Sequence, residues 1–414
     1  MVDAGAIRAT LLRQAQHWAQ ATERLSQLDA LASREAWSRL ERYLGLSIRD
    51  HLRSVLTRLR ERGTALVTSV QSAQSATDLA DARRRLLSFR REYLRAEITI
   101  DFYSDAINSR ANAVIGARLR ACDILAQRSM SAILEPLGHL TPIALTYIDK
   151  GLGASILKAG LRLWDGGNPS VAAAIKLVHH NIEQPTSLIH EAGHQVAHIT
   201  SWNAELARAI REAIQPAPIA DLWASWASEI SADGVAFVHT GFGSVLALHD
   251  VLADEPAQVF AIVPGDPHPS SYLRVLLGVA MCRVAWGKGE WDAFGDTWDA
   301  LYPLHLAAAH MRPVLEAARA HADTVAQITI AAPMQAFRGK RLIDLVPTER
   351  VSPTALTALE QRLGPALYTS SHWIWTEALR LLALTSLGTH RSTLKAPRLT
   401  HDWMLRLGGV AVAA

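Results

Sequence analysis

The sequence predicts an α+β protein that is predominantly α-helical, with a small sheet beside one central helix and a helical domain before it. Three observations predict this class. Residues 1–135 contain no proline and little glycine, and leucine, alanine, arginine and glutamine recur there at helical spacing. Residues 141–180 contain short apolar runs, separated by a glycine-rich turn, that are typical of strands. From residue 185 onward, the apolar residues return to helical spacing.

The composition is that of an ordinary globular protein. The 414 residues are 49% hydrophobic and 20% charged, which is enough for two or three domains with substantial cores. The formal net charge of +3 is too small to indicate nucleic-acid binding by itself. No signal peptide and no apolar stretch of about 20 residues is visible, so we expect a cytoplasmic protein without a membrane span. The two cysteines, Cys122 and Cys282, stand far apart, which fits a reducing compartment.

We expect residues 1–135 to form a separate helical domain, built as a bundle or a coiled-coil-like assembly of three or four helices. Breaks are predicted near residues 44–47 and 74–77, with Asp78 opening the next helix. This next helix is the most basic stretch of the chain and carries Arg83, Arg84, Arg85, Arg90, Arg91 and Arg95. Because apolar residues interleave with these arginines, an amphipathic helix with a solvated basic face is the simplest interpretation. A docking surface for an acidic protein partner or for nucleic acid stays open.

A small sheet is predicted directly before the central helix, from residues 141–149, 155–164 and 171–180. The middle segment is either a strand or a short helix that leads into one. In the last segment, alternate residues can face a core while Lys176 faces water, as is typical of an edge strand. Such an exposed edge could pair with an extended peptide through main-chain hydrogen bonds.

The central helix is predicted at residues 185–199, which read PTSLIHEAGHQVAHI. His190 and His194 are four residues apart and therefore on one helix face, where two imidazoles can bind a single zinc ion. Glu191 would lie beside the metal, where a carboxylate can take a proton from a zinc-bound water. Gly193 in mid-helix indicates that another backbone approaches closely. The alternative is a buried helix with two hydrogen-bonded histidines.

A third ligand is predicted on the helical stretch at residues 221–240. A catalytic zinc ion takes three protein ligands and keeps one position open, so a carboxylate from a neighbouring helix can complete the set. Glu229 fits that role. Asp233, one turn later, can accept the N–H of a ligating histidine and so fix its orientation. An acidic helix face in water is the alternative, but Trp223 and Trp226 indicate a largely buried helix, where unpaired carboxylates would be costly.

A further candidate segment reads DPHPSSYLR at residues 266–274. Pro269 or Ser270 can start a helix, which leaves His268 fixed before it and Arg274 inside its first turns. His268 could donate a hydrogen bond to the oxyanion of a tetrahedral intermediate, and Arg274 could hold a carboxylate of the site in place. Taken alone, the stretch could equally be a helix-capping loop with a surface histidine.

These three segments, in this order, resemble the gluzincin metallopeptidases, and most closely the group that includes the CAAX prenyl endopeptidases. In that group an H-E-x-x-H helix is followed by an E-x-x-x-D helix and then by a His-Pro segment with a downstream arginine. The resemblance covers roughly residues 140–285. It implies zinc on His190, His194 and Glu229, a water activated by Glu191, Asp233 behind a ligating histidine, and His268 and Arg274 supporting the transition state.

The resemblance thus implies a zinc metalloendopeptidase that hydrolyses bonds in peptide or protein substrates. Residues 136–286 would form a zincin-like catalytic core, and the helix-rich residues 287–414 would pack on it. One alternative is a regulatory or interaction protein whose zinc site is structural or inactive; a structural site would have four protein ligands. Another is a protease recruited to DNA-bound substrates through the arginine-rich helix.

Overall fold

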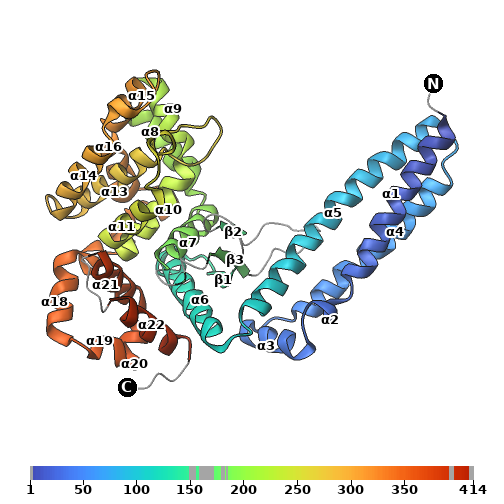
Figure 1. Cartoon of the computed structure of the whole chain (residues 1–414), viewed down its shortest axis with the longest axis horizontal. Coiled ribbons are helices and arrows are strands. Elements are labelled where there is room, and N and C mark those ends of the chain that lie inside the picture. Colours follow the sequence, from blue (N-terminus) through green and yellow to red (C-terminus); the bar gives the residue numbers. More distant parts are fainter. Residues whose placement is uncertain are drawn as a thin grey trace. The chain divides into compact units, whose positions relative to one another are not determined.

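The computed structural model describes residues 3–148, 155–157, 172–178, 182, 185–390 and 396–409 (Figure 1). The chain divides into two compact units, the first ending at Ala111 and the second beginning at Asn112. Each unit has a hydrophobic core of its own. The predicted class is confirmed at this level, because the described residues are mostly helical and include one small sheet.

The first unit is built on three long helices that run side by side, α1 (Ala4–Leu25), α4 (Ile48–Gln71) and α5 (Ala76–Ser109), joined through α2 (Leu28–Leu31) and α3 (Arg34–Leu44) (Figure 1). The buried residues of α5 alternate at spacings of three and four, which is the seam of a coiled coil: Leu79, Ala82, Leu86, Phe89, Tyr93 and Ala96. Two breaks lie close to the predicted positions, at residues 45–47 and 72–75, whereas the breaks at residues 26–33 and 110–112 were not predicted. Asp78 closes a capping box with Ser75 at the start of α5.

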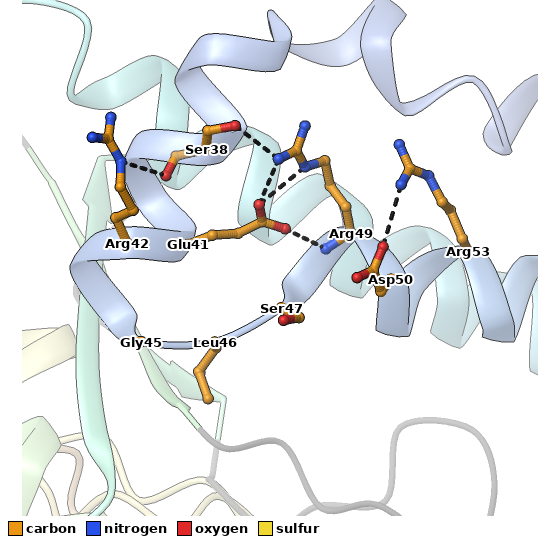
Figure 2. Close-up of a pocket in the computed structure, with 9 residues that line it drawn as sticks. All are labelled: Ser38, Glu41, Arg42, Gly45, Leu46, Ser47, Arg49, Asp50 and Arg53. Atoms are coloured by element: carbon orange, nitrogen blue, oxygen red, sulfur yellow. Dashed lines mark hydrogen bonds and ion pairs between the residues drawn. The ribbon is translucent and has the colours of Figure 1, made fainter.

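A partly buried ion pair joins α3 to α4 at the rim of a hollow of about 490 Å³ (Figure 2). Glu41 accepts hydrogen bonds from the backbone N of Arg49 at 2.8 Å and from its Nε and Nη2 at 3.1 and 2.6 Å. Arg49 also donates to Ser38 Oγ at 2.8 Å. Burial opposes ionisation of Glu41, but Arg49 holds the pKa of this carboxyl below its usual value. The contact therefore fixes the turn between the two helices.

The second unit begins earlier than the predicted boundary at residue 135, because α6 (Ala113–Leu134) belongs to it. This helix is buried on several faces and packs against the central helix and the first strand. Asp123 of α6 accepts from the backbone N and the Oγ of Thr146 at 2.6 and 2.8 Å. No boundary divides the described part of this unit near residue 286 either, since its helices share one core from α6 to the C-terminal helix.

The sheet has three strands in the order β1 (Ile143–Ile148), β3 (Ala172–Leu177) and β2 (Ser155–Leu157). β3 pairs in parallel with β1 and antiparallel with β2. The prediction of an edge strand at residues 171–177 is therefore wrong. Lys176 suggested an exposed edge, but Ala173, Ala174 and Ile175 are all buried, as befits a central strand covered on both faces. Residues 158–171, which include the predicted turn, lie outside the described part of the chain.

The central helix, α7 (Thr186–Ile199), follows the sheet, and the remaining helices complete the second unit around it (Figure 1). They are α8 (Trp202–Ala213), α9 (Ala217–Ser225), α10 (Ala227–Thr240), α11 (Phe242–Leu252), α12 (Pro256–Val259), α13 (Ser271–Trp286), α14 (Glu290–Leu301), α15 (Arg312–Arg319), α16 (Ala322–Ala326), α17 (Leu342–Leu345), α18 (Pro353–Leu363), α19 (Ala366–Thr369), α20 (Ser371–Thr376), α21 (Ala378–His390) and α22 (Ala396–Leu407). Within the described ranges, none of the helices has the length and apolarity needed to cross a bilayer.

Candidate metal centre

The candidate site lies where α7 meets α10. The two helices touch at Gly193, where an added Cβ would stand 2.8 Å from the Cα of Ala232 and 2.9 Å from its carbonyl oxygen. Only glycine permits this approach of two backbones, as its position in mid-helix predicts. The close crossing brings the first turn of α10 opposite His190 and His194, so that Glu229 can reach both of them.

Three side chains converge at this crossing. His190 Nε2 lies 3.3 Å from Glu229 Oε2, and His194 Nε2 lies 3.2 Å from Glu229 Oε1. One ligand atom from each residue can be chosen so that all three lie within 4.8 Å of one another. Ligand atoms about 2.1 Å from a tetrahedral zinc ion are about 3.4 Å apart, so the histidine–carboxylate separations match such a site. The residues can therefore hold a divalent metal ion.

A buried oxygen of Glu229 supports this fit. Oε2 is shielded from solvent and makes no well-aligned hydrogen bond with any part of the protein that the structure describes, although Arg274 Nη2 and His190 Nε2 lie 3.2 and 3.3 Å away. A buried carboxylate oxygen without a hydrogen bond is costly, and a metal ion would supply the missing partner. Burial opposes ionisation of Glu229, yet His190 and His194 hold the pKa of this carboxyl far below its usual value. It is thus a charged oxygen donor.

Asp233 and Arg274 form a charged support behind the cluster. Asp233 Oδ1 lies 2.8 Å from His190 Nδ1, the nitrogen that faces away from Glu229. Arg274 donates from Nε and Nη2 to the two oxygens of Asp233 at 2.7 and 2.8 Å, a bidentate contact. Arg274 is only 7% exposed, so its charge compensates Glu229 and Asp233 in a region with little water. Asp233 therefore lies against His190, and Arg274 lies against Glu229 and Asp233, as the sequence predicts.

The two carboxylates of the cluster attract positive charge to His190, against the opposing charge of Arg274. Burial disfavours a charged imidazole, but Asp233 and Glu229 outweigh it and raise the pKa of His190 to about 9. Burial likewise disfavours a charged Asp233, but Arg274 and His190 lower its pKa to about 2. The two carboxylates that stabilise an imidazolium would stabilise a divalent cation in the same way.

Glu191 is buried on α7 next to the two histidines, with 6% of its surface exposed. Burial raises the pKa of this carboxyl; Glu229 also raises it, whereas His190, His194 and Arg274 lower it. These opposing influences show that Glu191 feels the charges of the whole cluster. A carboxylate with a raised pKa is a better proton acceptor, which is what a general base requires.

His268 precedes α13 and is the most exposed member of the predicted set, with 57% of its side chain accessible. Its Nε2 lies 3.6 Å from Glu229 Oε2, so the ring borders the cluster. Asp266 holds it there, since its Oδ1 lies 2.6 Å from His268 Nδ1 and accepts from the backbone N at 3.0 Å. Asp266 was not predicted as a site residue. An aspartate two residues before a histidine, in a proline-rich turn, is the signal that could have revealed it.

A polar chain on the far side of His194 was also missed. Ser228 Oγ lies 3.4 Å from His194 Nδ1 and accepts from Asn203 Nδ2 at 3.5 Å. Ser231 donates to Asn203 Oδ1 at 2.7 Å. These residues connect α8 to the start of α10 behind the second histidine. His198, one turn further along α7, is exposed and is not part of the described cluster.

Comparisons of the chain with known protein families, with curated proteins and with solved structures found no match.

Proposed function

We propose that the protein is a zinc-dependent metalloendopeptidase of the gluzincin type, which hydrolyses bonds within peptide or protein substrates. The observation that carries the proposal is the convergence of His190, His194 and Glu229 at zinc-ligand separations, with Glu191 buried beside them. Among the residues that the structure describes, three side chains form the ligand set, which would leave a coordination position open, whereas structural zinc sites use four. This count favours hydrolysis over the alternative of a regulatory protein with a structural site.

The proposed mechanism divides the chemistry between the metal and the chain. A bound zinc ion would polarise the substrate carbonyl and lower the pKa of a coordinated water towards about 7. Glu191 then accepts a proton from the attacking water and delivers it to the leaving amine, because a carboxylate whose pKa is raised by burial can carry a proton in both directions.

His268 and Arg274 stabilise negative charge in this mechanism. With Nδ1 held by Asp266, Nε2 of His268 faces the cluster, where an N–H at this nitrogen would donate to the developing oxyanion. Arg274 keeps Asp233 and Glu229 ionised and oriented, so that Asp233 fixes the ring of His190. Arg274 contacts the site carboxylates and not the reacting atoms, so it is a positioning residue.

The sheet beside α7 offers a way to hold an extended substrate. β2 and β3 both contact α7, and β2 forms one edge of the sheet among the described strands. Main-chain groups along a sheet edge can bind a peptide without reference to its side chains. This supports a peptide as the substrate, and moves the predicted pairing edge from β3 to a neighbouring strand.

The test joins metal analysis to cleavage of a peptide library. The wild-type chain is expected to bind one zinc ion and to cleave internal peptide bonds. Glu191→Gln should bind the same amount of zinc and lose activity by about 10³-fold or more, because only the proton acceptor is removed. Glu212→Gln, an exposed glutamate on α8, is the matched control and should retain full activity. Full turnover by Glu191→Gln, or a chain that binds no zinc, would refute the proposal.

A further inference from the structure

The three-helix first unit contains a hollow of about 420 Å³ between α1 and α5, lined by Arg13, Gln14, His17, Trp18, Leu86, Leu87 and Arg90. Its floor is apolar, and Leu87 is 43% exposed although it is a leucine on a coiled-coil helix. Trp18 packs between two neighbours, with its ring 5.0 Å from that of Tyr93 and with Arg90 above it at 5.8 Å. An aromatic side chain fixed in this way is typical of a docking surface.

The hollow carries positive charge that the unit does not neutralise. No acidic residue lines it. Two glutamates of α1 and α5 pair with α4 instead, Glu23 with Arg60 at 2.6 Å and Glu92 with Arg62 at 2.5 Å, and Glu97 of α5 accepts from the hydroxyl of Tyr93 at 3.0 Å. Within the described residues, neither Arg13 nor Arg90 makes an ion pair, and Arg90 lies over the ring of Trp18. Two cations therefore face solvent beside an apolar floor.

The apolar surface continues from the hollow along α5. Leu94 is partly buried and Ile98 is 55% exposed, and they lie seven and eleven residues after Leu87. This spacing puts the three side chains on one face of the helix. The phosphate groups of a nucleic acid would pair with the arginines, but they would form no favourable contact with this apolar stripe. A helix with both leucine-like and acidic side chains matches both features.

We propose that the groove between α1 and α5 binds an acidic amphipathic helix of a partner protein, which lies along the coiled coil as a fourth helix. Its apolar side chains cover Trp18, Leu87 and Ile98, and its carboxylates pair with Arg13 and Arg90. The proposal concerns the first unit alone and does not depend on hydrolysis by the second.

The test uses an 18-residue, fluorescein-labelled peptide of leucine and glutamate at helical spacing, titrated with the full chain and followed by anisotropy. The chain carries Glu191→Gln so that turnover cannot consume the probe. The double variant Arg13→Glu/Arg90→Glu should bind at least 10-fold more weakly, and Leu87→Asn several-fold more weakly. Arg39→Glu, at a 65% exposed arginine of α3 outside the hollow, should stay within twofold.

Two further probes separate the possible partners. A peptide with serine in place of leucine should bind several-fold more weakly, and a 20-nucleotide single-stranded DNA should bind more weakly than the acidic peptide. Thermal unfolding confirms that each variant is folded; Arg13→Gln/Arg90→Gln replaces the double variant if charge reversal unfolds the unit. The proposal is overturned if the arginine variants bind the peptide as the parent does, if serine replaces leucine without loss, or if the DNA binds more tightly.

Discussion

At the scale of single residues, the two histidines of α7 are supported by different groups. Asp233 contacts His190 at 2.8 Å and is itself fixed by two hydrogen bonds from Arg274. Ser228 contacts His194 at the longer distance of 3.4 Å and carries no charge. A carboxylate raises the basicity of a ligating imidazole more than a hydroxyl does, so we expect His190 to be the stronger donor. Ser228 then mainly orients the ring of His194.

Ser228→Ala should lower zinc affinity about 10-fold, because the ring of His194 loses the group that orients it. Zinc affinity is measured by competition with a chromophoric chelator, and the d–d spectrum of the cobalt-substituted protein reports ligand geometry. Ser228→Thr keeps the hydroxyl and should restore most of the affinity. Ser225→Ala, at an exposed serine one turn earlier, is the control. Equal affinities for Ser228→Ala and the wild type would show that the serine has no such role.

The sequence predicts the residues of the centre better than their supports. His190, Glu191 and His194 are evident because helical spacing fixes their relation, and Glu229 and Asp233 share a face for the same reason. Asp266 and Ser228 were missed for different reasons. The partner of Asp266 is local, but aspartate is so common in turns that its position alone decides little. Ser228 meets His194 only through the crossing of two helices, which no local pattern encodes.

At the scale of secondary structure elements, the centre depends on how closely α7 and α10 cross. Helix positions and breaks follow from proline, capping residues and apolar spacing, and the sequence predicts most of them. The order of the strands cannot be predicted in the same way, because a run of small apolar residues fits a central strand and an edge strand equally well. The three alanines of β3 suggest little about its neighbours, although β3 lies between β1 and β2.

Gly193→Ala should destabilise the second unit by about 2–3 kcal/mol and weaken metal binding, because the new methyl group overlaps the backbone of Ala232. Urea unfolding measures the first effect and chelator competition the second. Gly295→Ala on α14 is the matched control. Its Cβ would meet only a Val279 methyl at 3.2 Å, so the gain in helix propensity, up to about 1 kcal/mol, offsets the crowding. A Gly193→Ala chain as stable as the control would contradict the close crossing.

A buried histidine that joins α10 to α6 predicts a pH dependence of stability. His239 Nε2 donates to the carbonyl of Ser129 at 3.0 Å, and burial lowers the pKa of His239 to about 4, against the opposing effect of that carbonyl. The unfolded chain, with a pKa near 6.5, therefore binds a proton that the folded chain does not. Stability should fall as pH drops from about 6.5 to 4, by up to about 3 kcal/mol from this group.

The variant His239→Gln isolates this effect, since glutamine can still donate to Ser129 but does not titrate. Urea unfolding of both proteins at several pH values between 7 and 4 gives the difference in slope, from which contributions of the other ionisable groups cancel. The wild type should lose stability more steeply than the variant below pH 6.5. Parallel slopes would mean that the pKa of His239 is the same in the folded and the unfolded protein.

At the scale of the whole molecule, the chain consists of two units with separate cores. The sequence predicts a helical first domain but puts its end at residue 135, because α5 and α6 have the same helix-rich composition. Tertiary packing decides which unit α6 belongs to, because α6 contributes Leu119, Cys122 and Leu125 to the core that also contains α7. Composition cannot reveal which core a helix joins when both are built of the same residues.

The division into units predicts how metal removal affects unfolding. A metal ion that binds only the folded second unit stabilises it by about 4 kcal/mol when its free concentration exceeds the dissociation constant a thousandfold. Calorimetry of the full chain should therefore show one transition that shifts down by several degrees on adding a chelator and one that does not move. Glu41→Gln removes the ion pair with Arg49 in the first unit and should lower only the transition that the chelator does not move, which assigns that transition to the first unit. Glu191→Gln should retain the metal-dependent shift, and Glu229→Gln should lose it, since only the latter removes a ligand. A chelator that moves both transitions, or neither, would show that the ion is not bound within the core of the second unit.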